Sequence, residues 1–192
     1  MKHYGLMLII ISSFFTKMNA LSFKGVETIP IAKTLFKQII EGKEKLIDLT
    51  NKNFIIVSVR EEGSDGRFYA VDEDGTVWLS GAVSSGANDF RSPSGVFPML
   101  QKKRYHMSGE NPSASGINNM DYMMRFTNGG HALHKGSVNW MSHGCIHLSI
   151  KDVPMLFKWT TKKTKIIITR HSYMPFAGMD LRKIYIKKYD AL

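Results

Sequence analysis

One short segment holds the residues best suited to covalent chemistry. Cys145 is the only cysteine among 192 residues, and it lies within the sequence WMSHGCIHL. His143 precedes the cysteine by two positions and His147 follows it by two, so imidazoles flank the thiol on both sides. A thiol in this setting can be a metal ligand, a buried structural group or a nucleophile.

A zinc site is the first alternative. His143, Cys145 and His147 alternate, so a strand would place all three on one side, and His134 could complete a tetrahedral set. However, Gly144 interrupts a regular strand beside the cysteine. The segment also offers no carboxylate that could act as general base to a metal-bound water. We therefore predict no catalytic metal, and the sequence indicates no other cofactor.

The other two alternatives are a buried, unreactive thiol and a nucleophile. Free cysteine is commonly buried, yet no apolar stretch precedes Cys145, and buried histidines would need partners for their ring nitrogens. A nucleophile needs a base to take the thiol proton, because the free thiol has a pKa of about 8.5. Gly144 permits a tight turn that brings backbone N–H groups toward a developing oxyanion. The residues favour nucleophilic acyl transfer.

Four segments resemble the L,D-transpeptidase (YkuD-like) family of bacterial wall enzymes. SHGCIHL resembles its signature of Ser/Thr-His-Gly-Cys, an apolar residue, then Arg or Asn. ALHKG resembles the earlier histidine segment, and VDEDGTVWLSGAVSSG resembles the family's preceding hairpin. SSGANDFRSPSGVFPMLQK resembles a further family segment through Ser85, Gly86, Ser92, Pro93, Gly95 and Phe97. The resemblance extends from about residue 53 to about residue 170.

The resemblance implies a fold and an activity. The fold would be a mainly-β sandwich with mixed sheets and few helices. The activity would be L,D-transpeptidation of peptidoglycan stem peptides: cleavage after meso-diaminopimelate through a thioester, then transfer to an amine. The acceptor amine would come from another stem peptide, a lipoprotein lysine or a D-amino acid. An L,D-carboxypeptidase, with water as acceptor, and a non-catalytic wall-binding module remain alternatives.

The resemblance also implies roles for individual residues. Cys145 corresponds to the nucleophile and His134 to the general base. Ser142, His143 and Gly144 correspond to the turn that carries and supports the oxyanion N–H groups. Candidate substrate-binding residues are His147, Gly136, Ser92 and Tyr122.

Two departures from the family pattern affect the expected activity. His147 stands where Arg or Asn is usual, so support for the turn or for a substrate carboxylate becomes weaker or pH-dependent. Only ten residues separate His134 from Cys145, so the segment SVNWM forms a reduced lid and should admit water. His131 matches no family position, and we favour a structural or surface role for it.

Local sequence patterns predict the elements that would hold these residues. Residues 28–41 predict a helix, because Ile31, Leu35 and Ile39 recur every four residues before Gly42. Strand patterns begin at residue 53 and include a hairpin around Asp74-Gly75. A helix follows the cysteine over about 150–160, and TKIIITR closes as a strand.

The chain divides into four expected parts. Residues 1–20 form a signal peptide, because a basic start precedes an apolar run too short to span a bilayer, which takes about 20 residues. An N-terminal helical extension covers 21–52, the catalytic domain 53–170, and a basic C-terminal extension 171–192. We therefore expect an exported protein, periplasmic or associated with the cell wall, whose mature form begins near Leu21.

Positive charge is concentrated near the C-terminal end. The formal net charge is +10. Residues 151–192 contain ten Lys and Arg against three Asp. Such a charge favours anionic partners, here a wall or membrane surface. The aromatic-interleaved patterns of base-reading modules are missing, so we expect no nucleic-acid partner.

Overall fold

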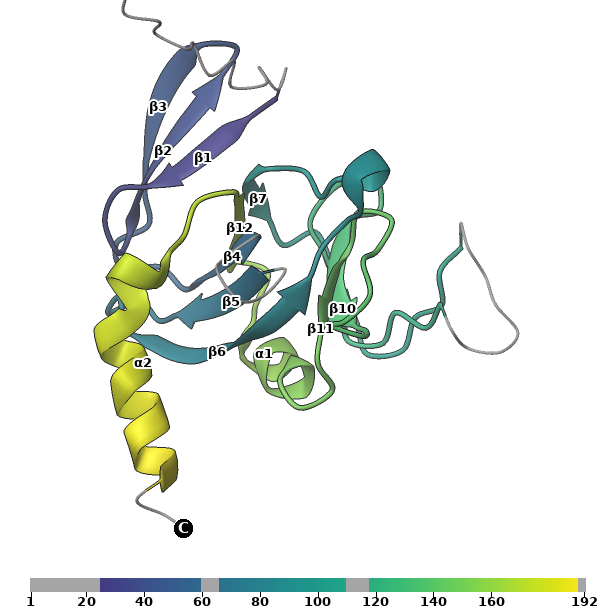
Figure 1. Cartoon of the computed structure of the whole chain (residues 1–192). Coiled ribbons are helices and arrows are strands. Elements are labelled where there is room, and N and C mark those ends of the chain that lie inside the picture. The colour runs from purple at the N-terminus through teal and green to yellow at the C-terminus, as the bar shows by residue number, and fades with distance from the viewer. Residues whose placement is uncertain (1–24, 60–65, 110–117, 190–192) are drawn as a thin grey trace, which may run out of the picture.

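The body of the protein is a mixed β-sheet that curls on itself (Figure 1). The structure is a computed structural model that describes residues 25–59, 66–109 and 118–189, so the expected signal peptide lies outside the described residues. Within them the sheet has nine strands in the order β7-β12-β4-β5-β6-β11-β10-β9-β8. Their bounds are β4 Phe54–Val59, β5 Gly66–Val71, β6 Val77–Ser84, β7 Gly95–Pro98, β8 Gln101–Lys103, β9 Met123–Arg125, β10 Ala132–Lys135, β11 Ile146–Leu148 and β12 Lys165–Thr169. The expected mainly-β fold with few helices is confirmed.

Strand β4 is buried on both faces of this sheet. Ile55 and Val57 belong to one apolar cluster, which also contains Leu133 and Ile146 from the far half of the sheet. Because residues from both halves share this cluster, the curled sheet packs against itself as two layers of a sandwich would. The alternate residues Phe54 and Ile56 enter a second cluster on the opposite face.

The hairpin expected at Asp74-Gly75 is confirmed as the β5–β6 turn. The N–H of Gly75 donates to the carbonyl of Asp72 at 2.9 Å, and Gly75 has a φ of 80°. The strand expected at TKIIITR is β12, which pairs in parallel with β4. The helix expected after the cysteine is α1, Val153–Trp159. After the long loop that follows β6, the chain forms two short strands, β7 and β8.

The helix expected over 28–41 is wrong. These residues form β1 Glu27–Pro30 and β2 Leu35–Ile40, which join β3 Lys43–Asp48 in an antiparallel sheet of three strands within the described residues. Strand β2 buries the alternate side chains of Phe36 and Gln38, a period of two that also fits the sequence. The residue expected to end the helix, Gly42, forms the β2–β3 turn with Glu41; their φ angles are 78° and 50°.

A C-terminal helix, which the sequence did not predict, covers the second apolar cluster. This helix, α2 (Met174–Tyr189), contributes Ala177 and Leu181 to the cluster. Asp180 on α2 binds Lys33 at 2.7 Å and accepts the N–H of Val77, so it joins the N-terminal sheet, β6 and α2. Neither α1 nor α2, as far as the chain is described, is long and apolar enough to cross a membrane.

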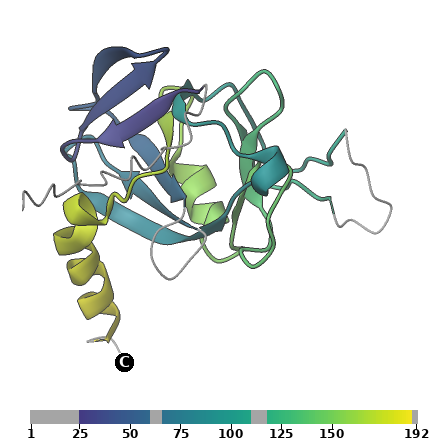
Figure 2. The same ribbon diagram turned by 45° about the horizontal axis from the view of Figure 1, so that its top comes forward.

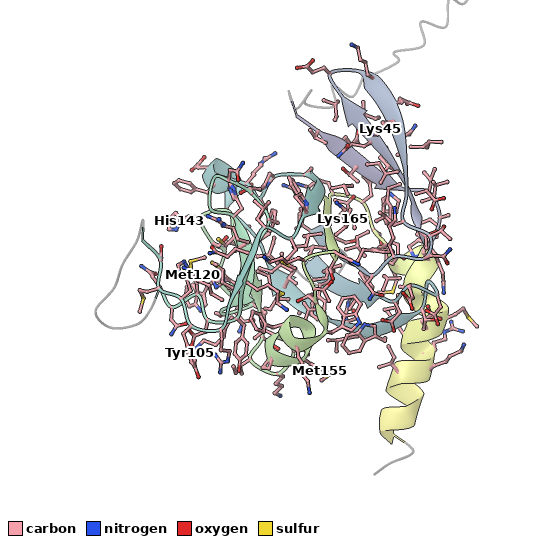
Figure 3. All side chains as sticks on the ribbon, turned by 180° about the vertical axis from the view of Figure 1, so that it is seen from behind. Lys45, Tyr105, Met120, His143, Met155 and Lys165 are labelled. Atoms are coloured by element: carbon pink, nitrogen blue, oxygen red, sulfur yellow. The ribbon has the colours of Figure 1, made fainter. Side chains whose placement is uncertain are left out.

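The N-terminal sheet and the cysteine segment lie at opposite ends of the molecule. In Figure 3, Lys45 marks the N-terminal sheet and His143 marks the cysteine segment, and the body of the sheet separates them. Figure 2 shows the short helix η1 (Asn88–Phe90) beside the loops around β10 and β11. The half of the sheet that contains β11 and β10 therefore holds the candidate site.

Candidate active site

Two short parallel strands bring the histidines of the cysteine segment together. Strand β10 carries His134 and pairs with β11, in which His147 is the direct partner of His134. Their ring centroids lie 5.0 Å apart, at a steep interplanar angle of 72°. Strand β11 also pairs with β6, opposite Ser84. Cys145 is the residue just before β11, so it enters the strand that carries His147 and that pairs with the strand of His134.

The turn before Cys145 is fixed by the hydroxyl of Ser142. This hydroxyl donates to the carbonyl of Cys145 at 2.6 Å and accepts the N–H of Gly144 at 3.0 Å. Gly144 has a φ of 111°, a region that favours glycine. The Gly144 amide is thus engaged within the turn, and the expected role of the turn in binding an oxyanion stays a prediction. Cys145 itself is half-buried.

A second segment supports the turn from behind. The N–H of Ser142 donates to the carbonyl of Ser85 at 2.9 Å, and the hydroxyl of Ser92 donates to the carbonyl of Gly144 at 2.9 Å. Ser92 also accepts the N–H of Gly86 at 3.0 Å. A Cβ on Gly86 would lie 2.8 Å from the Cα of Gly144, so the two segments touch through their glycines. Ser92 was a candidate substrate-binding residue, yet these bonds place it under the turn.

His134 is buried in the form suited to accepting a proton. Its Nδ1 lies 2.8 Å from the carbonyl oxygen of Lys135. A carbonyl can only accept, so Nδ1 carries the proton and Nε2 of the neutral ring has the lone pair. Burial, with a smaller contribution from His147, lowers the pKa of His134 to about 4. At neutral pH the ring is therefore uncharged and can act as a base.

His147 connects His134 to the reduced lid. Its Nδ1 lies 3.0 Å from the carbonyl of Ser137 and 3.2 Å from that of Trp140, so this N–H donates to two carbonyls of the lid. Burial lowers the pKa of His147, so an uncharged ring stands where the family usually has Arg or Asn. A Cβ on Gly136 would meet the Cγ of His147 at 2.6 Å, so this glycine provides the space for the ring.

The remaining expected residues lie in different surroundings. His143 is exposed, and its ring packs edge-on against Phe90 with centroids 4.7 Å apart. Tyr122 packs against Phe157 and under the guanidinium of Arg104, which lies 3.5 Å from the ring centroid. These contacts place Tyr122 against α1 and the β8–β9 connection, so its suggested substrate contact stays a prediction.

His131 is the residue of this site that sequence reasoning missed. A Cβ on Gly144 would lie 2.9 Å from both Cδ2 and Nε2 of His131, so the ring touches the cysteine turn. The only available signal was the clustering of four of the seven histidines between residues 131 and 147. Clustering along the chain does not indicate which ring meets the turn.

The site offers polar groups but no evident cage for a metal ion. In the described ranges, no group of three or more His, Cys, Asp and Glu side chains is arranged to hold a metal. The Nδ1 atoms of His134 and His147 donate to backbone carbonyls. The lack of a catalytic metal stays a prediction for solution measurements.

Comparison with known proteins identifies the family. The family model for the L,D-transpeptidase catalytic domain (YkuD) matches residues 52–168. The chain belongs to this family, whose members are acyltransferases that act on peptidoglycan stem peptides. A search of curated proteins gives no match.

Solved structures share the fold at low sequence identity. An Enterococcus faecium L,D-transpeptidase mutant is similar with a TM-score of 0.51 and 20% identity, over 62% of this chain and 50% of that one. An L,D-transpeptidase from Stackebrandtia nassauensis gives a TM-score of 0.51 and 20% identity, over 62% and 57%. The chain thus spans about half the length of these two proteins.

Proposed function

We propose that this protein is a cysteine-dependent L,D-transpeptidase acting on peptidoglycan stem peptides. The observation that carries this proposal is the cysteine turn beside a buried, neutral histidine. Ser142 and Ser92 hold the turn that presents the half-buried Cys145, and His134 lies on the adjacent strand with Nδ1 bonded to a carbonyl. A fixed thiol next to a neutral imidazole is the arrangement that cysteine acyl transfer requires.

In the proposed reaction the thiol proton passes to Nε2 of His134, and the thiolate of Cys145 attacks the carbonyl of the meso-diaminopimelate residue. The C–N bond to the following residue breaks, and the leaving amine takes the proton from His134. The acyl group is then bound to sulfur as a thioester. An acceptor amine attacks the thioester and releases the free thiol. A stem peptide, a lipoprotein lysine or a D-amino acid could supply this amine.

Hydrolysis of the thioester is the second candidate activity, and the lid favours it. Trp140 is 75% exposed and Met141 is 49% exposed, so the lid is spread on the surface. The hydrogen bonds from His147 to the carbonyls of Ser137 and Trp140 also keep the lid in this position. Because a closed site is what protects a reactive intermediate from water, this lid should allow carboxypeptidase leakage.

Mass analysis of muropeptides separates the two activities. The purified protein is incubated with tetrapeptide stems while the concentration of an acceptor amine is raised. Cross-linked or exchanged products should grow with acceptor while tripeptide persists as a side product. If tripeptide is the only product at every acceptor concentration, the protein is an L,D-carboxypeptidase and the transpeptidase proposal is wrong. If neither product forms, the non-catalytic wall-binding module becomes the favoured interpretation.

The place of action is part of the proposal. We place the protein outside the cytoplasm, periplasmic or wall-associated, because its substrate is wall material and residues 1–20 have the pattern of a signal peptide. The basic C-terminal region would hold it on an anionic wall or membrane surface. Fractionation and N-terminal sequencing test this: a mature start near Leu21 supports export, and Met1 in the cytoplasm contradicts it.

A further inference from the structure

The imidazole of His131 forms one wall of the cysteine turn, although nothing in the proposed reaction uses it. The ring occupies the space that a Cβ on Gly144 would need, with Cδ2 and Nε2 each 2.9 Å from that position. Gly144 is the residue directly before Cys145, and its φ of 111° determines how the chain enters the cysteine. The ring therefore lies against the backbone that leads into the cysteine.

Thr127 holds the ring of His131 in this orientation. The N–H of His131 donates to Oγ1 of Thr127 at 3.0 Å, and Nδ1 lies 2.9 Å from the same oxygen. The carbonyl of His131 accepts the N–H of Phe126 at 3.0 Å. Because the Nδ1 edge is bound to Thr127, the opposite edge, formed by Nε2 and Cδ2, faces Gly144.

The turn is therefore held from three directions. Ser142 bonds its interior, Ser92 bonds the carbonyl of Gly144, and the ring of His131 packs against the side of Gly144 where a Cβ would stand. The two serines fix polar atoms, whereas His131 limits the rotation of the Gly144 backbone by contact. Removing that contact would free a glycine, the residue with the widest range of backbone conformations.

We infer that His131, anchored by Thr127, is a positioning residue that fixes Cys145 for attack. This inference rests on the proposed function for its effect on turnover. Displacing a reacting atom by about 1 Å can lower a rate on the order of 10²-fold, so a freer turn should lower kcat more than it changes KM.

The test compares four variants with the unaltered protein. His131→Ala removes the ring, Thr127→Val removes its anchor, the double variant removes both, and Thr127→Ser keeps the hydroxyl. The readouts are kcat and KM on tetrapeptide stems, the rate of Cys145 alkylation by iodoacetamide at pH 7, and Tm. His171→Ala is the matched control, because it removes an imidazole that pairs with Glu27 at 2.8 Å.

We expect His131→Ala to lower kcat about 10- to 100-fold with KM changed by less than about twofold. Alkylation should slow toward the rate of an unassisted thiol. Thr127→Val should reproduce most of this loss, whereas Thr127→Ser should retain the kcat and the alkylation rate of the unaltered protein. The double variant should lose no more than His131→Ala, because both changes act through one contact. His171→Ala should leave both rates unaltered.

Two results would overturn the inference. One is an unaltered kcat and alkylation rate in His131→Ala. The other is a fall in both rates that only follows the unfolded fraction, since that indicates a role in folding alone. Alkylation needs no peptidoglycan, so a protein that turns over no stem peptide would refute the proposed function while the alkylation series still decides the role of His131.

Discussion

The two halves of the curled sheet differ in the length of their strands and in the interactions that hold them. Around β4 and β12 the strands are five or six residues long, and β4 is buried at every position. Around β10 and β11 the strands are four and three residues long, and they carry two histidines. The first half is held by apolar packing on both faces. The second half packs Leu133 and Ile146 into the first apolar cluster, and its cysteine turn is held by hydrogen bonds to serine hydroxyls and by close contacts at glycines. Changes in the first half should therefore alter stability, and changes in the second should alter reactivity.

The largest expected effect belongs to the cysteine itself. Cys145→Ala should remove all turnover and all acylation by carbapenem-type β-lactams, which the family resemblance suggests as covalent inhibitors. Its Tm should stay close to that of the unaltered protein, because Cys145 is half-buried and outside both apolar clusters. Kinetic assays with thermal unfolding check both statements. Appreciable turnover by the alanine variant would refute the nucleophile assignment.

Removing the base should have the next largest effect. His134→Ala should lower kcat about 10²–10⁴-fold, the usual range for general-base assistance. The pH profile of Cys145 alkylation should move toward that of a free thiol, with a pKa of about 8.5. A profile identical to that of the unaltered protein would transfer the base role to His143 or His147.

A change in the half around β4 and β12 should lower stability and leave the reactivity of Cys145 unaltered. Ile56 is fully buried in the second apolar cluster. Ile56→Ala should lower the free energy of unfolding by about 2–5 kcal/mol, measured by urea denaturation. The alkylation rate of the folded variant should not change. Ile150→Ala is the matched control, because Ile150 is 58% exposed and its loss should be nearly neutral.

Acid should weaken the fold through His134. The folded pKa is about 4 and the ordinary value is 6.5, so the unfolded chain binds the proton first as pH falls. The contribution of His134 is fully present above about pH 6.5 and decreases down to about pH 4, by about 3 kcal/mol in total. His134→Asn should flatten this part of the curve of unfolding free energy against pH. An equally steep curve in the variant would mean that other groups cause the loss.

The smallest expected effect concerns the space behind His147. In Gly136→Ala the new Cβ would lie 2.6 Å from the ring of His147, which must move and disturb the adjacent His134. We expect kcat to fall on the order of tenfold. In the control Gly109→Ala no atom of the described residues lies within 4 Å of the new Cβ, so activity should be retained. Equal rates in the two variants would mean that His147 does not support the base.

Local sequence patterns predicted the elements that have a distinct apolar run or a strong turn signal. The apolar run of β4 and the turn at Asp74-Gly75 are of this kind. Residues 28–41 carry both a four-residue and a two-residue apolar spacing, and tertiary packing of Phe36 selected the strand. Helix α2 has little amphipathic periodicity, so its sequence gave no clear helical signal.

The candidate site was predictable where a motif is contiguous in sequence. Ser142, Gly144 and Cys145 are neighbours, and Ser142 bonds the turn within the same motif. The support from Ser92 crosses 52 positions of the chain. The contact between His131 and Gly144 depends on how the β10 and β11 segments lie together. Neither can be read from spacing, because each depends on strand pairing in three dimensions.

The central claim is that Cys145 carries the acyl group during turnover, and intact-protein mass spectrometry tests it most directly. The protein is mixed with a tetrapeptide stem, quenched in acid during steady turnover and weighed, and the peptide that contains Cys145 is then sequenced. We expect a mass increase equal to the tripeptide acyl group, located on Cys145 and lost when an acceptor amine is added before the quench. Consumption of the stem with the Cys145 peptide unmodified throughout would contradict the account.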